Sequence, residues 1–468
     1  MAGEWELIAA LREELAELRK EVRQLRTRVA ALETENAELR RLLDEERRKG
    51  KRQAAPFSKG SPKTNPNKPG RKGGSEYGRQ SRRPIPERID RTVVVQCPLQ
   101  CPSCGGQVKL KNKATQYQTD IPAIQPTTTA FEVHYGECVQ CGRRVQGRHS
   151  EQTSDAIGAV GAEQIGPNAI AVTAHLNKSC GVSYERVADI FKQVFGLDVN
   201  RSTLARALLR LGQKAEPTYE NLIEQIRKSA VVYPDETGWR IGGLKAWLWA
   251  VTTLTATVYL IERGRGFAEA AKILGEAYAG VIGSDGWAPY RRFTKAQRQT
   301  CLAHLLRRCA ELLEAPPTED CAAYFTKIKS VLQDALALRD RRDDHRISGH
   351  GLLVSKGRLE ARLDRLLDDP DLHDESLRFA EHLVRNRKAM FLFLDRADVK
   401  ATNCLAEQAI RPAVINRKTS GGNRTPNGAR AQGVLMSVLR TCKLRCISAM
   451  DVFRLMLREP TPTVHLAR

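Results

Sequence analysis

Three carboxylates stand where they could hold a divalent cation. Asp235 and Asp285 each follow an apolar run typical of a buried strand. An acidic residue at a strand end is usually a turn former, and that interpretation would suffice for either aspartate alone. Glu407 lies four residues before Arg411 in a helical segment, where an ion pair within the helix is the simpler interpretation. Taken together, the three acids could supply the oxygen ligands that Mg²⁺ prefers.

The segments around the aspartates predict neighbouring strands. Gly242-Gly243 is typical of a hairpin turn. The predicted strands are 230–241, 244–253, 256–261 and 281–283, with a helix over 267–279 before the last one. A crossover helix would return the fourth strand parallel to the first, which brings Asp235 and Asp285 within reach of a common metal. This is the strand order of a ribonuclease H-like core.

Two cysteine pairs predict a structural zinc site. Both have C-x-x-C spacing followed by glycine, and the four thiols are Cys101, Cys104, Cys138 and Cys141. Four thiolates form a closed tetrahedral site, which supports folding rather than catalysis. The 33 residues between the pairs exceed the common spacing, so we expect strands of a ribbon there, with 127–135 as one. Chance pairing of thiols is the alternative, and Cys97 or His134 could replace a ligand.

Net charge and its placement favour nucleic acid as partner. The chain has 468 residues and a formal charge of +22, so we expect several folding units and a polyanionic partner. Segments 51–90 and 401–468 each hold 11 basic and 3 acidic residues. The first is also rich in Pro and Gly, which predicts a disordered linker that contacts DNA through residues such as Arg71 and Lys72. A merely soluble tether is the alternative.

The first 48 residues carry a heptad pattern. Every d position is Leu, several a positions are β-branched, and Asn36 occupies one a position. Oppositely charged g and e residues would pair across a parallel dimer, for example Glu14 with Arg19. We therefore expect a homodimer or higher oligomer through a parallel coiled coil. A lone amphipathic helix is the alternative, but it predicts a wider apolar stripe.

A helix-turn-helix is expected upstream of the strands. Two helical segments, 184–195 and 202–211, flank a turn that contains Gly196. The second helix would present Arg201 and Arg206 to a DNA groove. The same outline is common in ordinary helical domains, and only the basic context favours DNA binding. No apolar run is long enough to span a membrane and no secretory signal is evident, so we expect a cytoplasmic protein without membrane segments.

Five motifs occur in a fixed order along the second half of the chain. They are Asp235-Glu-Thr-Gly-Trp, Ser284-Asp285-Gly-Trp-Ala-Pro-Tyr, Cys301-Leu-Ala-His304-Leu-Leu-Arg307, Asn403-x-x-Ala-Glu407-x-x-Ile-Arg411-Pro and Asn416-Arg417-Lys418. In these motifs the chain resembles the insertion-sequence-sixty-six transposases (TnpC type) of the DDE class. The coiled coil, basic linker and paired cysteines resemble the N-terminal half of the family. The sequence departs from the family pattern at Cys404, at Gln408 and over 421–426.

The resemblance implies a DNA transposase that cuts the 3′ ends of its element at the terminal inverted repeats and joins them to target DNA. It implies Asp235, Asp285 and Glu407 as catalytic triad and as ligands of two Mg²⁺ ions, for which Mn²⁺ may substitute. Two such ions about 4 Å apart can activate a water or a 3′-hydroxyl and stabilise the departing oxygen. The remaining expected site residues are His304, Arg307 and Asn403 as support and Arg411, Arg417 and Lys418 as DNA contacts. For His304, packing of a helix is the plainer alternative.

The expected fold is a multidomain α+β chain with a ribonuclease H-like core interrupted by a helical insertion. The expected segments are 1–48 (coiled coil), 49–90 (linker), 91–150 (zinc ribbon-like module), 160–222 (helical DNA-binding domain), 228–300 (first part of the core), 301–398 (insertion), 399–458 (last part of the core) and 459–468 (tail). Two alternatives remain: a non-catalytic, zinc-containing dimeric DNA-binding regulator, and a ribonuclease H-like nuclease without strand transfer. The resemblance also suggests accessory proteins of the same element as partners.

Overall fold

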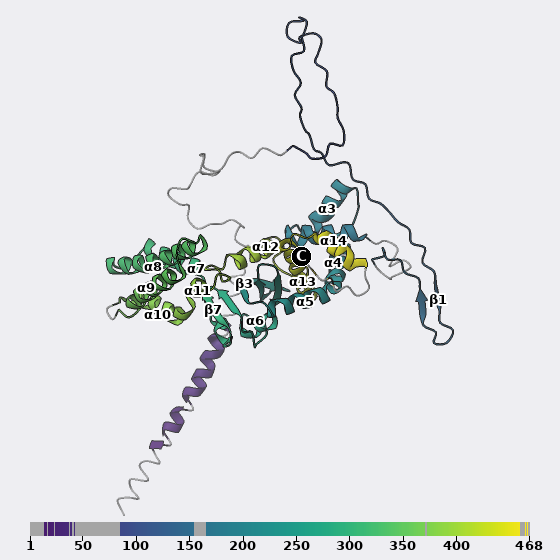
Figure 1. Cartoon of the computed structure of the whole chain (residues 1–468). Coiled ribbons are helices and arrows are strands. Elements are labelled where there is room, and N and C mark those ends of the chain that lie inside the picture. Colours follow the sequence, from purple (N-terminus) through teal and green to yellow (C-terminus); the bar gives the residue numbers. More distant parts are fainter. Residues whose placement is uncertain are drawn as a thin grey trace, which may run out of the picture. The chain divides into compact units, whose positions relative to one another are not determined.

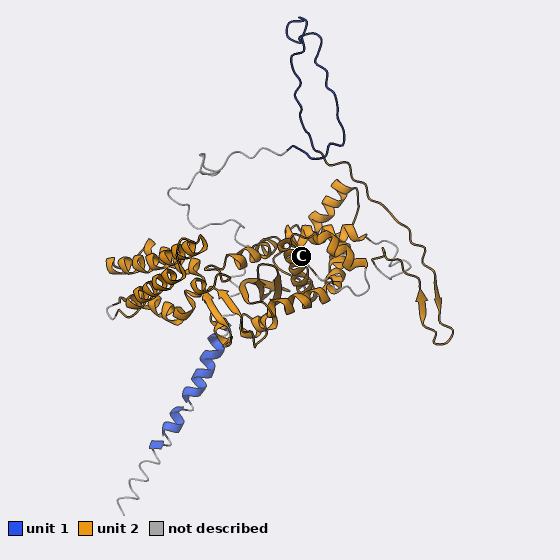
Figure 2. Cartoon of the chain, viewed as in Figure 1, with its two compact units in different colours: residues 1–119 blue, residues 120–468 orange. Residues whose placement is uncertain are grey.

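The computed structural model describes most of residues 14–42, residues 85–153, 165–369 and 372–458, and two positions near the C-terminus. The chain divides into two compact units, Met1–Thr119 and Asp120–Arg468, which Figure 2 colours separately. Most of the predicted linker, with Arg71 and Lys72, lies outside the described residues. No described helix is long and apolar enough to cross a membrane.

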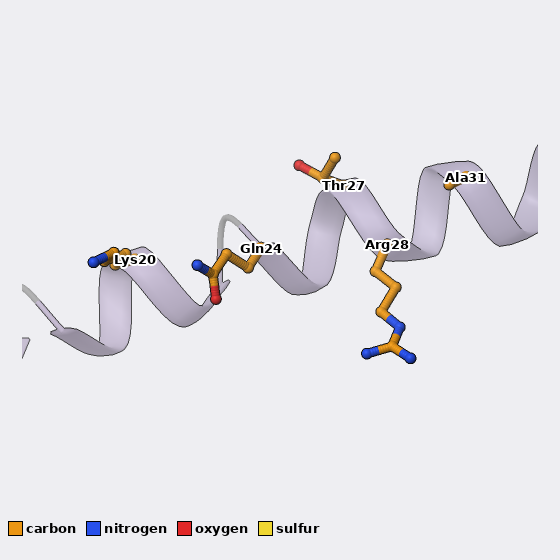
Figure 3. A pocket seen from close by; sticks show the side chains of 5 residues that line it. All are labelled: Lys20, Gln24, Thr27, Arg28 and Ala31. Atoms are coloured by element: carbon orange, nitrogen blue, oxygen red, sulfur yellow. The ribbon is translucent and has the colours of Figure 1, made fainter.

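In the first unit, every described residue between 14 and 42 is helical. Leu25 and Leu32 of the predicted seam are 55% and 52% exposed, so the apolar stripe faces solvent in the single chain. Figure 3 shows a hollow on this helix, which is lined by Lys20, Gln24, Thr27, Arg28 and Ala31. Four of these residues occupy the outer heptad positions c and f, and Arg28 occupies position g beside the seam, so the hollow contains no a or d residue and none of the predicted carboxylates.

A five-stranded mixed sheet forms the centre of the second unit (Figure 1). Its order is β5-β4-β3-β6-β7. The strands are β3 (Val231–Ile241), β4 (Leu244–Thr252), β5 (Thr257–Glu262), β6 (Val281–Ser284) and β7 (Gln297–Thr300). The first three are antiparallel, whereas β6 runs parallel to β3, and β7 runs parallel to β6. The predicted order of three strands, a helix and a parallel fourth strand is therefore observed, and β7 is an addition that we did not predict.

Local sequence explains the turn and the helix around these strands. Gly242 and Gly243 take left-handed φ values of +58° and +78°, which a two-residue hairpin turn requires and other residues would resist. The crossover helix α6 (Phe267–Leu274) is shorter than the predicted 267–279. It ends there because Gly275 adopts a φ of +77° and cannot continue the helix.

Helices from before and after the insertion pack on the sheet. They are α5 (Glu216–Arg227), α12 (Cys404–Ser420) and α13 (Pro426–Leu444), whereas α14 (Ala449–Arg458) packs on other helices, among them α13. α13 lies flush on β5, since a Cβ added to Gly433 would be 2.8 Å from the carbonyl oxygen of Tyr259. α12 packs on β3 and β4. This brings the last part of the chain onto the strands that carry the predicted aspartates.

A group of helices precedes the sheet in the chain. They are α2 (Pro167–Ala174), the π-helical turn η2 (His175–Ser179), α3 (Tyr184–Phe195) and α4 (Arg201–Lys214). α3 has the predicted bounds, and α4 is a little longer than predicted. Both pack through buried apolar residues such as Phe191 and Leu208 into the core cluster that also includes sheet residues.

The segment between β7 and α12 forms a second helical group with its own core (Figure 1). Its helices are α7 (Leu302–Glu314), α8 (Glu319–Asp343), α9 (Gly349–Leu367), α10 (Asp374–Asn386) and α11 (Leu392–Asp395), with the 3₁₀ turn η4 (Arg387–Ala389) between the last two. Another 3₁₀ turn, η3 (Ala288–Arg292), lies earlier, between β6 and β7. Phe325, Leu332 and Leu383 are buried at its centre. The segment is helical, as expected for an insertion between two parts of one sheet domain.

Candidate active site and DNA interface

Asp235 lies within β3, and Asp285 directly follows β6, the strand that runs parallel to β3. The parallel register pairs Val231 with Val281 and Val232 with Ile282, so each aspartate follows these pairs by the same number of residues. The Oδ1 atom of Asp285 accepts the backbone N–H of Trp287 at 2.9 Å, which orients the loop after β6. Asp235 is half-buried, whereas Asp285 is exposed. The charge of Asp285 acts on Asp235, and their sharing of one metal ion stays a prediction.

The pKa of Asp235 shows how its negative charge is disfavoured. It is raised to about 7, first by burial and then by the charges of Glu236 and Asp285. A divalent cation would relieve both effects, so the pair fits an oxygen-ligated metal. Among the described residues, however, no three His, Cys, Asp or Glu side chains are placed to hold one ion. The predicted triad is therefore not assembled as a metal site among the described residues, and its role as a set of metal ligands stays a prediction.

Glu407 lies in the first turn of α12 and faces α7. Its Oε1 atom is 3.7 Å from Nε2 of His304. The pKa of His304 is raised, chiefly by the neighbouring Cys301 thiol and further by the negative charge of Glu407. Nδ1 of His304 is buried and has no hydrogen-bond partner among the described residues. His304 therefore lies beside the third predicted acid, and its role as support for the site stays a prediction.

Asn403 joins three elements beside the aspartates. Its Nδ2 donates to the carbonyl oxygen of Pro234 at 3.0 Å, directly before Asp235. Its backbone N–H donates to Sγ of Cys301 at 3.1 Å, and its carbonyl oxygen accepts the N–H of Glu407 at 3.1 Å. Asn403 is 3% exposed. The start of α12 is thereby fixed to β3 and to the start of α7.

The predicted basic residues differ in how they are placed. Arg417 donates through Nη1 to Oγ1 of Thr237 at 2.9 Å and to the carbonyl oxygen of Gly238 at 2.5 Å, so it braces α12 against β3. Arg411 and Arg307 are exposed. They can meet a phosphate backbone without giving up a contact within the core.

The helix pair α3–α4 has the capping that a helix-turn-helix requires. Gly196 ends α3 with a φ of +68°, and the side chain of Asn200 accepts the N–H of Ser202 at 2.9 Å to cap α4. The N-terminal part of α4 is exposed at Arg201 and Arg206. Arg201 also pairs with Glu185 of α3 at 3.4 Å. The expected DNA-facing side chains are thus at the surface.

The π-helical turn before α3 is clamped to the core helices, a feature that sequence reasoning missed. Nδ2 of Asn416 on α12 donates to the carbonyl oxygen of Lys178 at 2.6 Å. The buried Nζ of Lys178 donates to Oε1 of Gln432 on α13 at 2.6 Å. Asn416 belongs to the Asn-Arg-Lys motif, so the sequence marked it as a residue of interest. The motif did not indicate that its side chain is buried against the π-helical turn.

Another missed group surrounds Glu236, the residue after Asp235. Its side chain is 4% exposed and pairs with Arg265 at 2.7 Å. Burial raises the pKa of Glu236, and the hydrogen bond from Arg265 opposes that rise. In the sequence, Glu236 is marked only as a second acid next to Asp235 in a predicted strand. Because successive residues of a strand face opposite sides of the sheet, a residue at this position faces away from Asp235.

The two cysteine pairs adopt turns with the same hydrogen-bond pattern. In each, the N–H of the first cysteine donates to the carbonyl oxygen five residues on, and the glycine four residues on donates back to that cysteine, at 2.8–2.9 Å. Gly105 and Gly142 take the left-handed φ values of +73° and +66°. Backbone hydrogen bonds lower the pKa of Cys101 and Cys138, which favours the thiolate form.

The arrangement of these two turns within the chain differs from the expected ribbon. The second turn lies in the small hairpin of β1 (Tyr135–Glu137) and β2 (Arg144–Gln146). Residues 127–134 form no strand, so the β-rich composition there was misleading. The first pair belongs to the first compact unit and the second pair to the other. Joint ligation of one zinc ion by both pairs stays a prediction.

Comparison with known proteins gives one family and several relatives. Residues 163–431 match the profile of the family described as "Transposase IS66 family". Three similar proteins come from Sinorhizobium fredii, and each is named only as an uncharacterized protein. y4qI is 24% identical over 55% of this chain and 52% of its own length, and y4jD is 23% identical over 55% of each. y4hP is 24% identical over 79% of this chain and 72% of its own. The chain spans about half the length of the first two relatives.

Proposed function

Because the chain belongs to the IS66 family of transposases, we propose that it binds the terminal inverted repeats of its element, cuts their 3′ ends and joins them to target DNA. The observation that carries this proposal is the parallel pairing of β3, which contains Asp235, with β6, which Asp285 follows, together with the effect of the Asp285 charge on Asp235. The strand order agrees with a ribonuclease H-like core, and the segment 301–398 would be its helical insertion. Family membership supports DNA processing in general. The three acids, Asp235, Asp285 and Glu407, are the reason to propose metal-dependent cleavage and joining in particular.

Asp235, Asp285 and Glu407 would hold the Mg²⁺ or Mn²⁺ ions. When bound, these ions supply an activated water or 3′-hydroxyl and a stabilised departing oxygen. The chain's own residues prepare the site. Asn403 ties the start of α12 to the residue before Asp235, and Glu407 lies beside His304. In the proposed site the core would present acids from three separate segments to the same metal ions.

DNA would be gripped by basic residues at two places. Arg201 and Arg206 on α4 would enter a groove, and Arg411 with Arg307 would meet the backbone beside the acids. Lys418 and the linker residues Arg71 and Lys72 complete the proposed set. Two further proposals concern assembly: a parallel coiled coil through the exposed seam, and a structural zinc ion held by the two cysteine turns.

Purified full-length protein with a duplex of the element ends and Mg²⁺ tests the proposal. We expect 3′-end cleavage and strand transfer by the unchanged protein and neither by Asp235→Asn. Asp320→Asn is the matched control, because Asp320 is an exposed aspartate at the start of α8 and lies outside the proposed site. Cleavage without joining would instead identify a nuclease. DNA binding with no chemistry at any stage would identify a regulator.

A further inference from the structure

The carboxylate of Glu236 is held on the opposite face of β3 from Asp235. Its Oε1 accepts the Nε–H of Arg265 at 2.9 Å, and Nη2 of Arg265 is 2.7 Å from the same oxygen. Its Oε2 accepts the hydroxyl of Tyr290 at 3.0 Å. Both oxygens are therefore occupied, so Glu236 is a fixed anchor rather than a free ligand for a metal.

Arg265 lies between two aromatic rings. Its guanidinium carbon is 4.4 Å from the ring centre of Trp247 and 4.0 Å from that of Trp287. These distances are typical of stacking of a cation on an aromatic face. The Arg265 side chain is 33% exposed. Water is thus largely excluded from the ion pair, which strengthens the interaction with Glu236.

The same contacts reach the second aspartate. The backbone N–H of Trp287 donates to Oδ1 of Asp285, and Tyr290 follows in the same turn, η3. A continuous path of contacts runs from Asp235 through Glu236 and Arg265 to Trp287 and Asp285. β3 and β6 pair directly only through two residues of each strand at the other end. The aspartate end of the two strands therefore depends on this path for its spacing.

We propose that Arg265 is a positioning residue that fixes the loop carrying Asp285 against β3 and so sets the separation of Asp235 and Asp285. The inference rests on the proposed function, in which these two aspartates share a metal. Arginine suits this role because its flat guanidinium can stack between two rings while it donates more than one hydrogen bond to a carboxylate. Lysine keeps the charge but provides neither the flat face nor the fork of donors.

The consequence is a change in metal affinity rather than in DNA affinity. Residues that orient a metal's ligands usually change metal affinity or activity by about 10- to 100-fold when replaced. Arg265→Lys should therefore weaken Mn²⁺ binding by about 10- to 100-fold. Binding of the end duplex in the presence of a chelator of Mg²⁺ should stay the same, because Arg265 is assigned to the protein and not to the phosphates.

Mn²⁺ titration of full-length, zinc-loaded protein, with free Mn²⁺ followed by electron paramagnetic resonance, measures this without requiring catalysis. Arg263→Lys is the matched control, because Arg263 is exposed two residues earlier. If Arg265→Lys does not fold, as judged by thermal unfolding, Glu236→Gln takes its place. This change removes the negative charge of Glu236 but keeps an oxygen and a nitrogen atom where the two carboxylate oxygens contact Arg265 and Tyr290. Glu236→Gln should also weaken Mn²⁺ binding.

The outcomes separate the inference from the function. Mn²⁺ affinity equal to that of the unchanged protein in both Arg265→Lys and Glu236→Gln overturns the inference and leaves the transposase proposal intact. Loss of DNA affinity without loss of Mn²⁺ affinity also overturns it, because Arg265 would then be a DNA contact. If the variants bind Mn²⁺ more weakly but the unchanged protein neither cleaves nor joins DNA, the inference about Arg265 is supported and the proposed transposase function is refuted. An unchanged protein that binds no Mn²⁺ contradicts both.

Discussion

Gly181 joins the π-helical turn to α3 at a place where a side chain has no room. Its φ is +72°, and a Cβ at this position would lie 2.8 Å from Cγ2 of Ile415 on α12. Gly181→Ala therefore carries two separate costs. A left-handed conformation costs a residue other than glycine about 1–2 kcal/mol. Displacing the Ile415 side chain from its rotamer adds about 0.5–1.5 kcal/mol.

The sum predicts that Gly181→Ala weakens the local structure by about 1.5–3.5 kcal/mol. Hydrogen exchange of backbone amides suits this measurement, because the chain has several folding units and global unfolding need not be two-state. Amides of α3 and of the C-terminal half of α12 should exchange about 10- to 300-fold faster, since 1.4 kcal/mol corresponds to a factor of ten. Amides of α8, which lies in the other helical group, are the internal reference.

The double variant with Ile415→Ala separates the two costs. Ile415 is 46% exposed, so its own truncation should cost little. In the Ile415→Ala background the collision is gone, and Gly181→Ala should cost only the about 1–2 kcal/mol of the backbone conformation. An equal cost in both backgrounds would refute the reasoning, because the contact between the turn and α12 would then carry no energy.

Three further predictions concern single groups. Burial lowers the pKa of Lys178 to about 7, so the unfolded chain binds more protons between pH 7 and 10.5. Stability should rise through that window by up to about 1.4 kcal/mol per pH unit, and urea unfolding of Lys178→Met should show a flatter profile. Asn403→Ala leaves the carbonyl of Pro234 without its donor, which should lower the free energy of unfolding by about 1–3 kcal/mol, as calorimetry can measure. Cleavage by this variant should fall, whereas its binding of end DNA, measured by fluorescence anisotropy, should be retained. Cys138→Ser should lower zinc content, measured by elemental analysis, and the midpoint of thermal unfolding; equal zinc in both proteins would contradict the predicted site.

The features that could be predicted from the sequence are those set by short-range patterns. α3 has its predicted bounds because Ser183 caps its start and Gly196 ends it. The β3–β4 hairpin follows from Gly242-Gly243 between two alternating runs. The parallel return of β6 follows from the handedness of a crossover connection. With these elements placed, the prediction that the two aspartates share a metal ion follows from the strand order and stays a prediction.

The features that could not be predicted depend on partners far away in the sequence. β7 contains mostly polar residues, and its Gln299 is buried by hydrogen bonds to Met390 and Phe393 of the insertion. A local pattern gives no sign of those bonds, so a polar strand was missed. Asn403 is buried for the same reason, through its bond to Pro234. The helix over 267–279 was too long because a Gly inside an apolar pattern gives no certain stop.

The orientation of Glu407 toward His304 is compatible with a role beside the aspartates. α12 is fixed near its start by Asn403 and near its end by Arg417, so Glu407 must change partners by rotating its side chain rather than by moving the helix. Its contact with His304 is a 3.7 Å approach between side chains that are 42% and 34% exposed. A pair this open contributes less than about 1 kcal/mol. In the proposed site, a divalent cation at the aspartates would attract a carboxylate far more strongly than that, so His304 would hold Glu407 without competing for it.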